Sequence, residues 1–106
     1  MAKSPKFFLP IFLLLLLFSQ IHRENLLILN SYHRGKVLSD DIISSIVESI
    51  KKDRPGAVFY IEDMDTKRND PSMLSEKLKN LYELKYESKT FDIIFTVDNN
   101  ALDFII

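Results

Sequence analysis

Cysteine is missing from this chain of 106 residues, and glycine and histidine occur only twice each. Without cysteine there is no disulfide framework, no thiolate zinc ligand, no thiol nucleophile and no cysteine-linked lipid anchor. Gly35 and Gly56 are too few for a glycine-rich phosphate loop, and His22 and His33 do not make a zinc site by themselves. The sequence therefore predicts no cofactor and no metal.

The chain also lacks an excess of charge of either sign. It carries 14 Lys and Arg against 15 Asp and Glu, so its formal net charge is -1. This balance excludes a strongly basic nucleic-acid-binding surface spread over the whole chain, and nucleic acid is not an expected partner. The hydrophobic fraction of 46% is too high for a disordered chain, and the length fits one domain at most.

One long apolar run stands near the N-terminus. Residues 7–18 read FFLPIFLLLLLF, and Lys3 and Lys6 precede them. Basic residues followed by an apolar stretch of about 7–15 residues are typical of an export signal, whereas a spanning helix needs about 20 apolar residues. No A-x-A cleavage pattern follows the run. We therefore expect residues 1–20 to be a signal peptide or an N-terminal membrane anchor, and the protein to be periplasmic or extracytoplasmic, either free or anchored in the inner membrane.

Three short segments have the composition of strands. Residues 25–30 read NLLILN, and four consecutive apolar residues between polar ends predict a strand buried on both faces. Residues 57–62 and 91–97, rich in β-branched and aromatic side chains, predict two more. Helical patterns lie between and after these strands. This alternation predicts an α/β fold with βαβ crossovers and an open parallel sheet.

Two complete helices are expected between the strands. Ser39 is the expected N-cap of the first, which should end at Pro55-Gly56 and bury a face of Ile42, Ile43, Ile46, Val47 and Ile50. Asp70 caps the second, with Pro71 in its first position and an apolar stripe of Leu74, Leu78, Leu81 and Tyr82. Residues 101–106 begin a third helix without an ending signal. We therefore expect the chain to be a truncated part of a longer protein.

Polar clusters follow all three expected strands. They comprise residues 30–33, residues 63–68 and residues 98–100. Ligands of open α/β sheets bind outside the carboxyl ends of the strands, so the clusters predict a site for a small polar or zwitterionic ligand. Each cluster also has a simpler interpretation: turn formers, solvated charges and a helix cap.

Two enzymatic or signalling alternatives use the same residues. Ser31, His33 and Asp98 contain the side chains of a hydrolase triad, but no G-x-S-x-G turn surrounds the serine, and Ser31 and His33 are too close in sequence. A periplasmic hydrolase therefore stays an unfavoured alternative. A phosphoacceptor receiver domain would need acidic residues after the first strand, where this chain has Asn30, Ser31 and Tyr32.

The segments LLILNSYHRG, SDDIISSI, YIEDMDTKR and FDIIFTVDNNALDFI together resemble one bacterial family. It comprises the extracytoplasmic substrate-binding proteins of the ABC-transporter type with a class I periplasmic-binding fold. The versions used as sensor regions of histidine kinases and diguanylate cyclases are the most similar. The resemblance covers residues 26–106 and only the first part of the family's length. Leu38 departs from it, because family members often carry an aromatic residue before the Ser-Asp-Asp.

The resemblance implies that residues 25–106 are the first half of one lobe of a two-lobed clamp, which closes on a small molecule such as an amino acid and performs no chemistry. Contacts in this fold come from the loops after the first and third strands, here Ser31, Tyr32, His33, Asp98 and Asn99. The implied partner is an ABC permease. The alternative is a sensor region followed by a fused kinase or cyclase domain.

Overall fold

The computed structural model describes residues 23–106. Strands and helices alternate along this part of the chain, as the sequence predicts. The elements are β1 (Asn25–Asn30), α2 (Val37–Asp53), β2 (Val58–Asp63), α3 (Pro71–Lys85), β3 (Ile93–Val97) and α4 (Asn99–Ile105). The expected signal or anchor at residues 1–20 lies outside the described residues.

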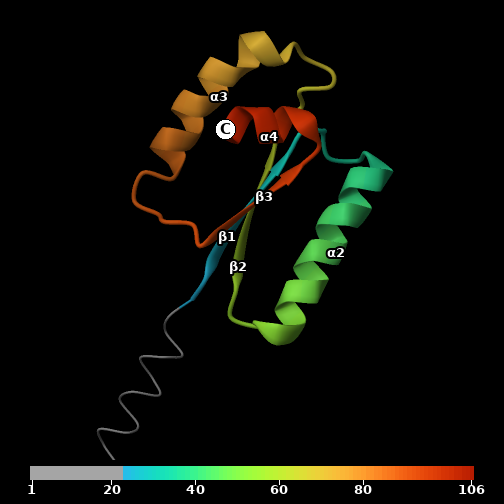
Figure 1. Cartoon of the computed structure of the whole chain (residues 1–106), viewed down its shortest axis with the longest axis vertical. Helices are drawn as coiled ribbons and strands as arrows, with labels where there is room; N and C mark the ends of the chain where they lie inside the picture. Colours follow the sequence, from blue (N-terminus) through green and yellow to red (C-terminus); the bar gives the residue numbers. More distant parts are fainter. Residues whose placement is uncertain (1–22) are drawn as a thin grey trace, which may run out of the picture.

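The three strands form one parallel sheet in the order β2-β1-β3 (Figure 1). Leu26 of the central strand is in register with Phe59 on one side and with Ile93 on the other. The apolar residues 26–29 are all buried. The prediction that β1 is buried on both faces is therefore confirmed, because successive side chains of a strand point to opposite faces and both sets are buried, Leu27 and Leu29 in one cluster and Ile28 in the other.

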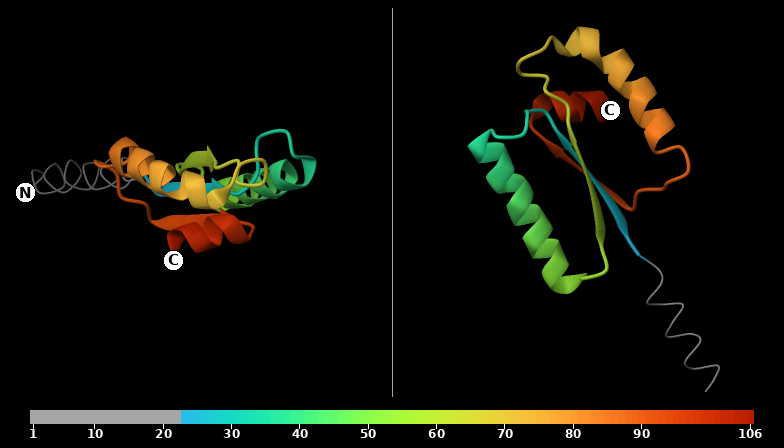
Figure 2. Two further views of the ribbon diagram at one scale, coloured as in Figure 1. Left: turned by 90° about the horizontal axis from the view of Figure 1, so that it is seen from above. Right: turned by 180° about the vertical axis from the view of Figure 1, so that it is seen from behind.

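Helices cover both faces of the sheet, which makes three layers (Figure 2). On one face, Ile43 of α2 packs against Ile28 and Val97. On the other face, α3 and α4 cover Leu27 and Leu29 through a second cluster. Aromatic rings dominate this second cluster, with edge contacts among Tyr60, Tyr82, Tyr86, Phe91 and Phe104. The α/β class and the parallel sheet are thus as expected.

Helix α2 begins earlier than the sequence predicts. Ser39 is not the N-cap: Lys36 holds that position without a side-chain hydrogen bond, and Ser39 lies in the first turn with its hydroxyl donating to the Lys36 carbonyl at 3.0 Å. Gly35, at φ 99°, donates its N–H to Asp40 Oδ2 at 2.9 Å. The helix begins early because this contact closes the preceding loop onto the first turn.

Helix α3 begins as predicted. Asp70 is its N-cap, Pro71 is the first helical residue, and the Asp70 carboxylate accepts the N–H of Ser72 at 3.0 Å. The predicted apolar stripe is wrong at Leu81, whose side chain is half exposed. Leu78 and Tyr82 pack against the sheet as predicted, and Tyr86, the C-cap residue four positions further on, extends the same line of contacts.

Candidate functional site

Tyr32 and Asp98 meet at the carboxyl ends of β1 and β3. The Tyr32 hydroxyl donates a hydrogen bond to Asp98 Oδ2, which joins two residues 66 positions apart. Between these loops and the start of α2 lies a half-enclosed cavity of about 210 Å³. Its lining consists of Tyr32, Lys36, Leu38, Ser39, Ile42, Val97 and Asp98. The cavity therefore lies where open parallel sheets bind their ligands.

Asp98 has an unusual backbone conformation. Its φ of 71° and ψ of 172° belong to a region that is almost confined to glycine. Three contacts hold the side chain: Oδ1 accepts the N–H of Asn99, Oδ2 accepts the Tyr32 hydroxyl, and Lys67 Nζ lies 3.7 Å from Oδ1. Backbone strain of this kind is concentrated at functional sites, and here it occurs at the cavity wall.

The same contacts set the protonation of Tyr32 and Asp98. The hydrogen bond from Tyr32 is the main cause that lowers the pKa of Asp98 below its ordinary value, and the Asn99 N–H and Lys67 lower it further against a smaller effect of burial. That hydrogen bond also raises the pKa of Tyr32, with partial burial and the charge of Asp98 acting in the same direction. At neutral pH the pair is therefore a carboxylate and a neutral phenol.

Two lysines approach the ring of Tyr32. Lys36 Nζ and Lys67 Nζ each lie 5.5 Å from the ring centroid, within the range of a cation–π contact. Lys67 is also paired with Asp98. The wall of the cavity thus combines an aromatic face, a carboxylate and the Lys36 ammonium group, and Lys67 stands beside Tyr32 and Asp98 outside the lining.

Ser31 lies behind the cavity and is completely buried. Its hydroxyl donates to the Val97 carbonyl at 2.6 Å and accepts the N–H of Ala101 at 2.8 Å. Its own carbonyl accepts the Thr66 hydroxyl at 2.8 Å. Ser31 therefore ties the end of β1 to β3, to α4 and to the loop after β2, and it does not line the cavity.

His33 and Asn99 do not line the cavity either. His33 Nδ1 lies 3.9 Å from Asp65 Oδ1 and has no hydrogen-bond partner in the described chain. Asp65 is held by Arg68 through bonds of 2.7 and 2.8 Å, and these bonds lower the pKa of Asp65. Asn99 is exposed, with its backbone N–H bound to Asp98. Of the five residues expected at the site, the structure thus brings Tyr32 and Asp98 together on the cavity wall.

The side chains of a hydrolase triad are present but are not connected. The Ser31 hydroxyl is occupied by the backbone groups of β3 and α4, and the Asp98 carboxylate is occupied by Tyr32. Across residues 23–106 no hydrogen bond joins Ser31, His33 and Asp98 to one another. The geometry does not support a nucleophilic serine at this position.

Sequence reasoning missed the part of the wall that α2 provides. Lys36 reads as one of several polar residues in a connection, and Ser39 reads as a cap. The signal that could have revealed this part of the wall is Leu38. It is an apolar residue just before the expected helix start, where no packing partner was expected for it. Leu38 remains largely exposed and forms the rim of the cavity together with Ile42.

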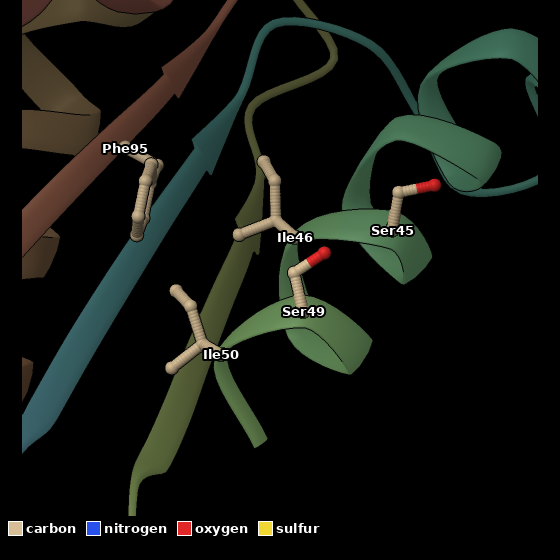
Figure 3. Close-up of a pocket in the computed structure, with 5 residues that line it drawn as sticks. All are labelled: Ser45, Ile46, Ser49, Ile50 and Phe95. Atoms are coloured by element: carbon tan, nitrogen blue, oxygen red, sulfur yellow. The ribbon is translucent and has the colours of Figure 1, made fainter. Parts of the chain in front are cut away.

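A hollow of about 400 Å³ lies at the C-terminal end of α2 and the amino end of β3, away from the edge where parallel sheets bind ligands, and is lined by Ser49, Ile50, Asp53, Arg54, Ile93 and Phe95. Two further hollows flank α2 and are chemically different. One, of about 310 Å³ beside β3, is lined by Ile46, Ile50, Phe95 and two serines, as Figure 3 shows, and carries no charge. The other lies beside β2, and its charges are already engaged: Arg34 lies 3.5 Å from Asp63, and Asp40 accepts the N–H of Gly35. The cavity at Tyr32 and Asp98 is therefore the best candidate for a polar ligand.

The part of the chain that the structure describes contains no group of three or more His, Cys, Asp or Glu side chains placed to hold a metal ion. Among its helices, none is both long and apolar enough to cross a membrane. Comparisons with protein-family models, with curated proteins and with solved structures find no match for this chain.

Proposed function

We propose that this protein binds a small polar ligand outside the cytoplasm, as the substrate-binding component of an ABC importer. The observation that carries the proposal is the cavity at the carboxyl ends of β1 and β3, with Tyr32 and the strained Asp98 on its wall. Parallel α/β sheets place their ligand sites at this edge. The resemblance of residues 26–106 to substrate-binding proteins supports the same function, with this sheet as the first half of one lobe.

A ligand screen on the full chain tests the proposal. Amino acids, short carboxylates, amides and polyols are added to the nitrogen-labelled protein in a nonionic detergent, and backbone amide shifts are recorded. At least one class should move the amides of Tyr32 and Asp98. Ile42→Trp, which fills the cavity, should abolish the response, and Glu48→Trp on the exposed face of the same helix should keep it. A response that survives Ile42→Trp, or no response to any class, contradicts the proposal.

Export is tested separately. A reporter that is active only outside the cytoplasm, fused after residue 60, should be active because residues 7–18 have the form of an export signal. Replacing Leu14 and Leu15 with arginine should abolish the activity, since a charge at the centre of such a segment costs about 2.5–3.5 kcal/mol. An active double-arginine variant would refute the export proposal.

A second candidate is the ligand-sensing region of a membrane-bound histidine kinase or diguanylate cyclase. The observation that favours it is the missing A-x-A pattern after the apolar run, which is typical of a retained anchor. The mass of the protein recovered from the membrane fraction and from the soluble extracytoplasmic fraction distinguishes the two. Loss of about 20 residues supports a released receptor, and an intact N-terminus supports an anchored sensor.

A further inference from the structure

The negative charge on the cavity wall belongs to Asp98, whose carboxylate already has hydrogen-bond and ion-pair partners. Asp98 accepts hydrogen bonds from the Tyr32 hydroxyl and the Asn99 N–H, and Lys67 Nζ lies 3.7 Å away. A ligand ammonium would have to compete with these groups for the same carboxylate. Breaking these contacts would leave the neutral Tyr32 phenol and the positively charged Lys67 beside the ligand. The structure therefore does not favour a cationic group at this position.

The Lys36 ammonium group, in contrast, has no ion-pair partner within the described residues. Its Nζ lies over the Tyr32 ring, and no carboxylate lies within 4.0 Å of it among residues 23–106. Residues 1–22 contain no aspartate or glutamate. The nearby acids have other partners, because Asp40 accepts the N–H of Gly35 and Asp65 is held by Arg68.

The charges that surround the Tyr32 ring therefore do not cancel. Lys36 and Lys67 contribute two positive charges and Asp98 contributes one negative charge, which leaves one positive charge beside the cavity. The rest of the lining is mostly apolar and comes from Leu38, Ile42 and Val97. An anionic group beside an apolar body complements this wall, and the volume of about 210 Å³ fits a body of a few carbon atoms.

We infer that the ligand of this cavity is a small monocarboxylate with a short apolar chain, whose carboxylate pairs with Lys36 and whose chain lies against Leu38, Ile42 and Val97. The inference rests on the proposed binding function and makes its ligand class narrower. It also departs from the amino-acid-like ligand that the resemblance implies, since an α-ammonium group has no open acid on this wall.

Three probes with one carbon skeleton test the inference on the full chain in a nonionic detergent. They are 3-methylbutanoate, its neutral amide, and L-valine, which adds an α-ammonium group to the same acid. Titrations follow the amide shifts of Tyr32 and Asp98. The carboxylate should bind at least about tenfold more tightly than the amide or L-valine, the difference expected for one interaction with a charged group. Its affinity should also fall with added salt.

Three lysine variants locate the charge. Lys36→Met keeps the apolar stem, removes no side-chain cap, and should weaken 3-methylbutanoate at least about tenfold. Lys52→Met, at the exposed far end of the same helix, should leave the affinity unchanged. Lys67→Met releases part of the Asp98 carboxylate and should therefore shift the preference toward L-valine.

The outcomes separate the inference from the proposed function. If L-valine or the amide binds as tightly as the acid, or if Lys36→Met binds the acid as wild type does, the inference is overturned while the cavity remains a binding site. If no probe moves the Tyr32 and Asp98 amides but another class of the wider ligand screen does, the inference again fails alone. If nothing in the wider screen binds, both fail.

Discussion

Ser31 illustrates how one buried hydroxyl can organise the site without touching a ligand. It bonds to backbone groups of β3 and α4, and its carbonyl receives the Thr66 hydroxyl. The strained Asp98 stands between the two backbone groups that Ser31 holds, at Val97 and Ala101. The conformation of the cavity wall therefore depends on a residue behind it.

Ser31→Ala should destabilise the protein by about 1–3 kcal/mol, because the Ala101 N–H loses its acceptor in a buried environment. Ser88 is exposed in the turn after α3, and Ser88→Ala should change the free energy of unfolding by less than about 0.5 kcal/mol. Urea unfolding of the two variants and the wild type measures both. Equal stability of Ser31→Ala and wild type would show that the hydroxyl is not needed.

Tyr82 predicts a loss of stability at high pH. Burial is the main cause that raises its pKa to about 12, and the charges of Glu62 and Asp63 raise it further. The unfolded phenol has a pKa near 10, so between about pH 10 and about pH 12 the unfolded chain releases a proton that the folded chain retains. Stability is therefore present below pH 10 and falls as the pH rises through this window.

Tyr82→Phe removes this titration, so its free energy of unfolding should decline less steeply over the same range. Urea unfolding at several pH values measures the slope, and phenolate absorbance follows the ionisation directly. Parallel slopes for variant and wild type would contradict the assignment to Tyr82.

At the scale of elements, the two long helices begin in different ways. Asp70 accepts bonds from the N–H and the hydroxyl of Ser72, whereas Lys36 at the start of α2 gives no side-chain cap. The first turn of α2 is held instead by Ser39 and by the contact between Asp40 and Gly35. This arrangement leaves the Lys36 side chain available to the cavity.

Asp70→Ala should cost about 0.5–2 kcal/mol, because the start of α3 loses its cap. Asp103 is an exposed aspartate in α4 whose carboxylate accepts no hydrogen bond in the described structure, so Asp103→Ala should stay within about 0.5 kcal/mol of wild type. The comparison is made by urea unfolding. A cost for Asp103→Ala equal to that for Asp70→Ala would rule out capping as the cause.

At the scale of the whole molecule, the sheet formed by residues 23–106 has an apolar edge strand without a second partner among those residues. Within the described chain β3 pairs only with β1, and its residues Ile93–Val97 carry no charge or proline. Ile93 and Ile94 are partly exposed, and the uncharged hollow of Figure 3 lies beside the same strand. An edge without such protective residues is a template for strand pairing between chains.

Self-association should therefore depend on β3. Ile94→Lys places a charge on the edge strand and should lower the associated fraction in sedimentation velocity, because a charged edge resists pairing. Leu84→Lys changes a more exposed apolar residue on α3 and should have little effect. All variants are compared in the same nonionic detergent, so that residues 7–18 experience one environment. If Leu84→Lys abolishes association and Ile94→Lys does not, the assignment of self-association to β3 is wrong.

Local sequence patterns by themselves determined the order of elements and the class of fold. The run of residues 26–29 predicts a strand buried on both faces, and Asp70-Pro71 predicts the start of α3. Both predictions rest on residues that are neighbours in the sequence. A continuous apolar run must be buried on both faces of its strand, and an N-cap side chain binds a backbone group two residues away. The expected site residues Tyr32 and Asp98 follow from the general rule that ligands bind at the carboxyl ends of strands.

Only the tertiary structure decided which side chains share the cavity. The placement of Ser31 behind the wall, of His33 beside Asp65 and of Lys36 over the Tyr32 ring depends on segments far apart in the sequence. The register of β1 against β3 brings Tyr32 to Asp98, and the early start of α2 adds Leu38 and Ile42. Such contacts form between elements whose relative position is set by packing, and no local periodicity encodes that position.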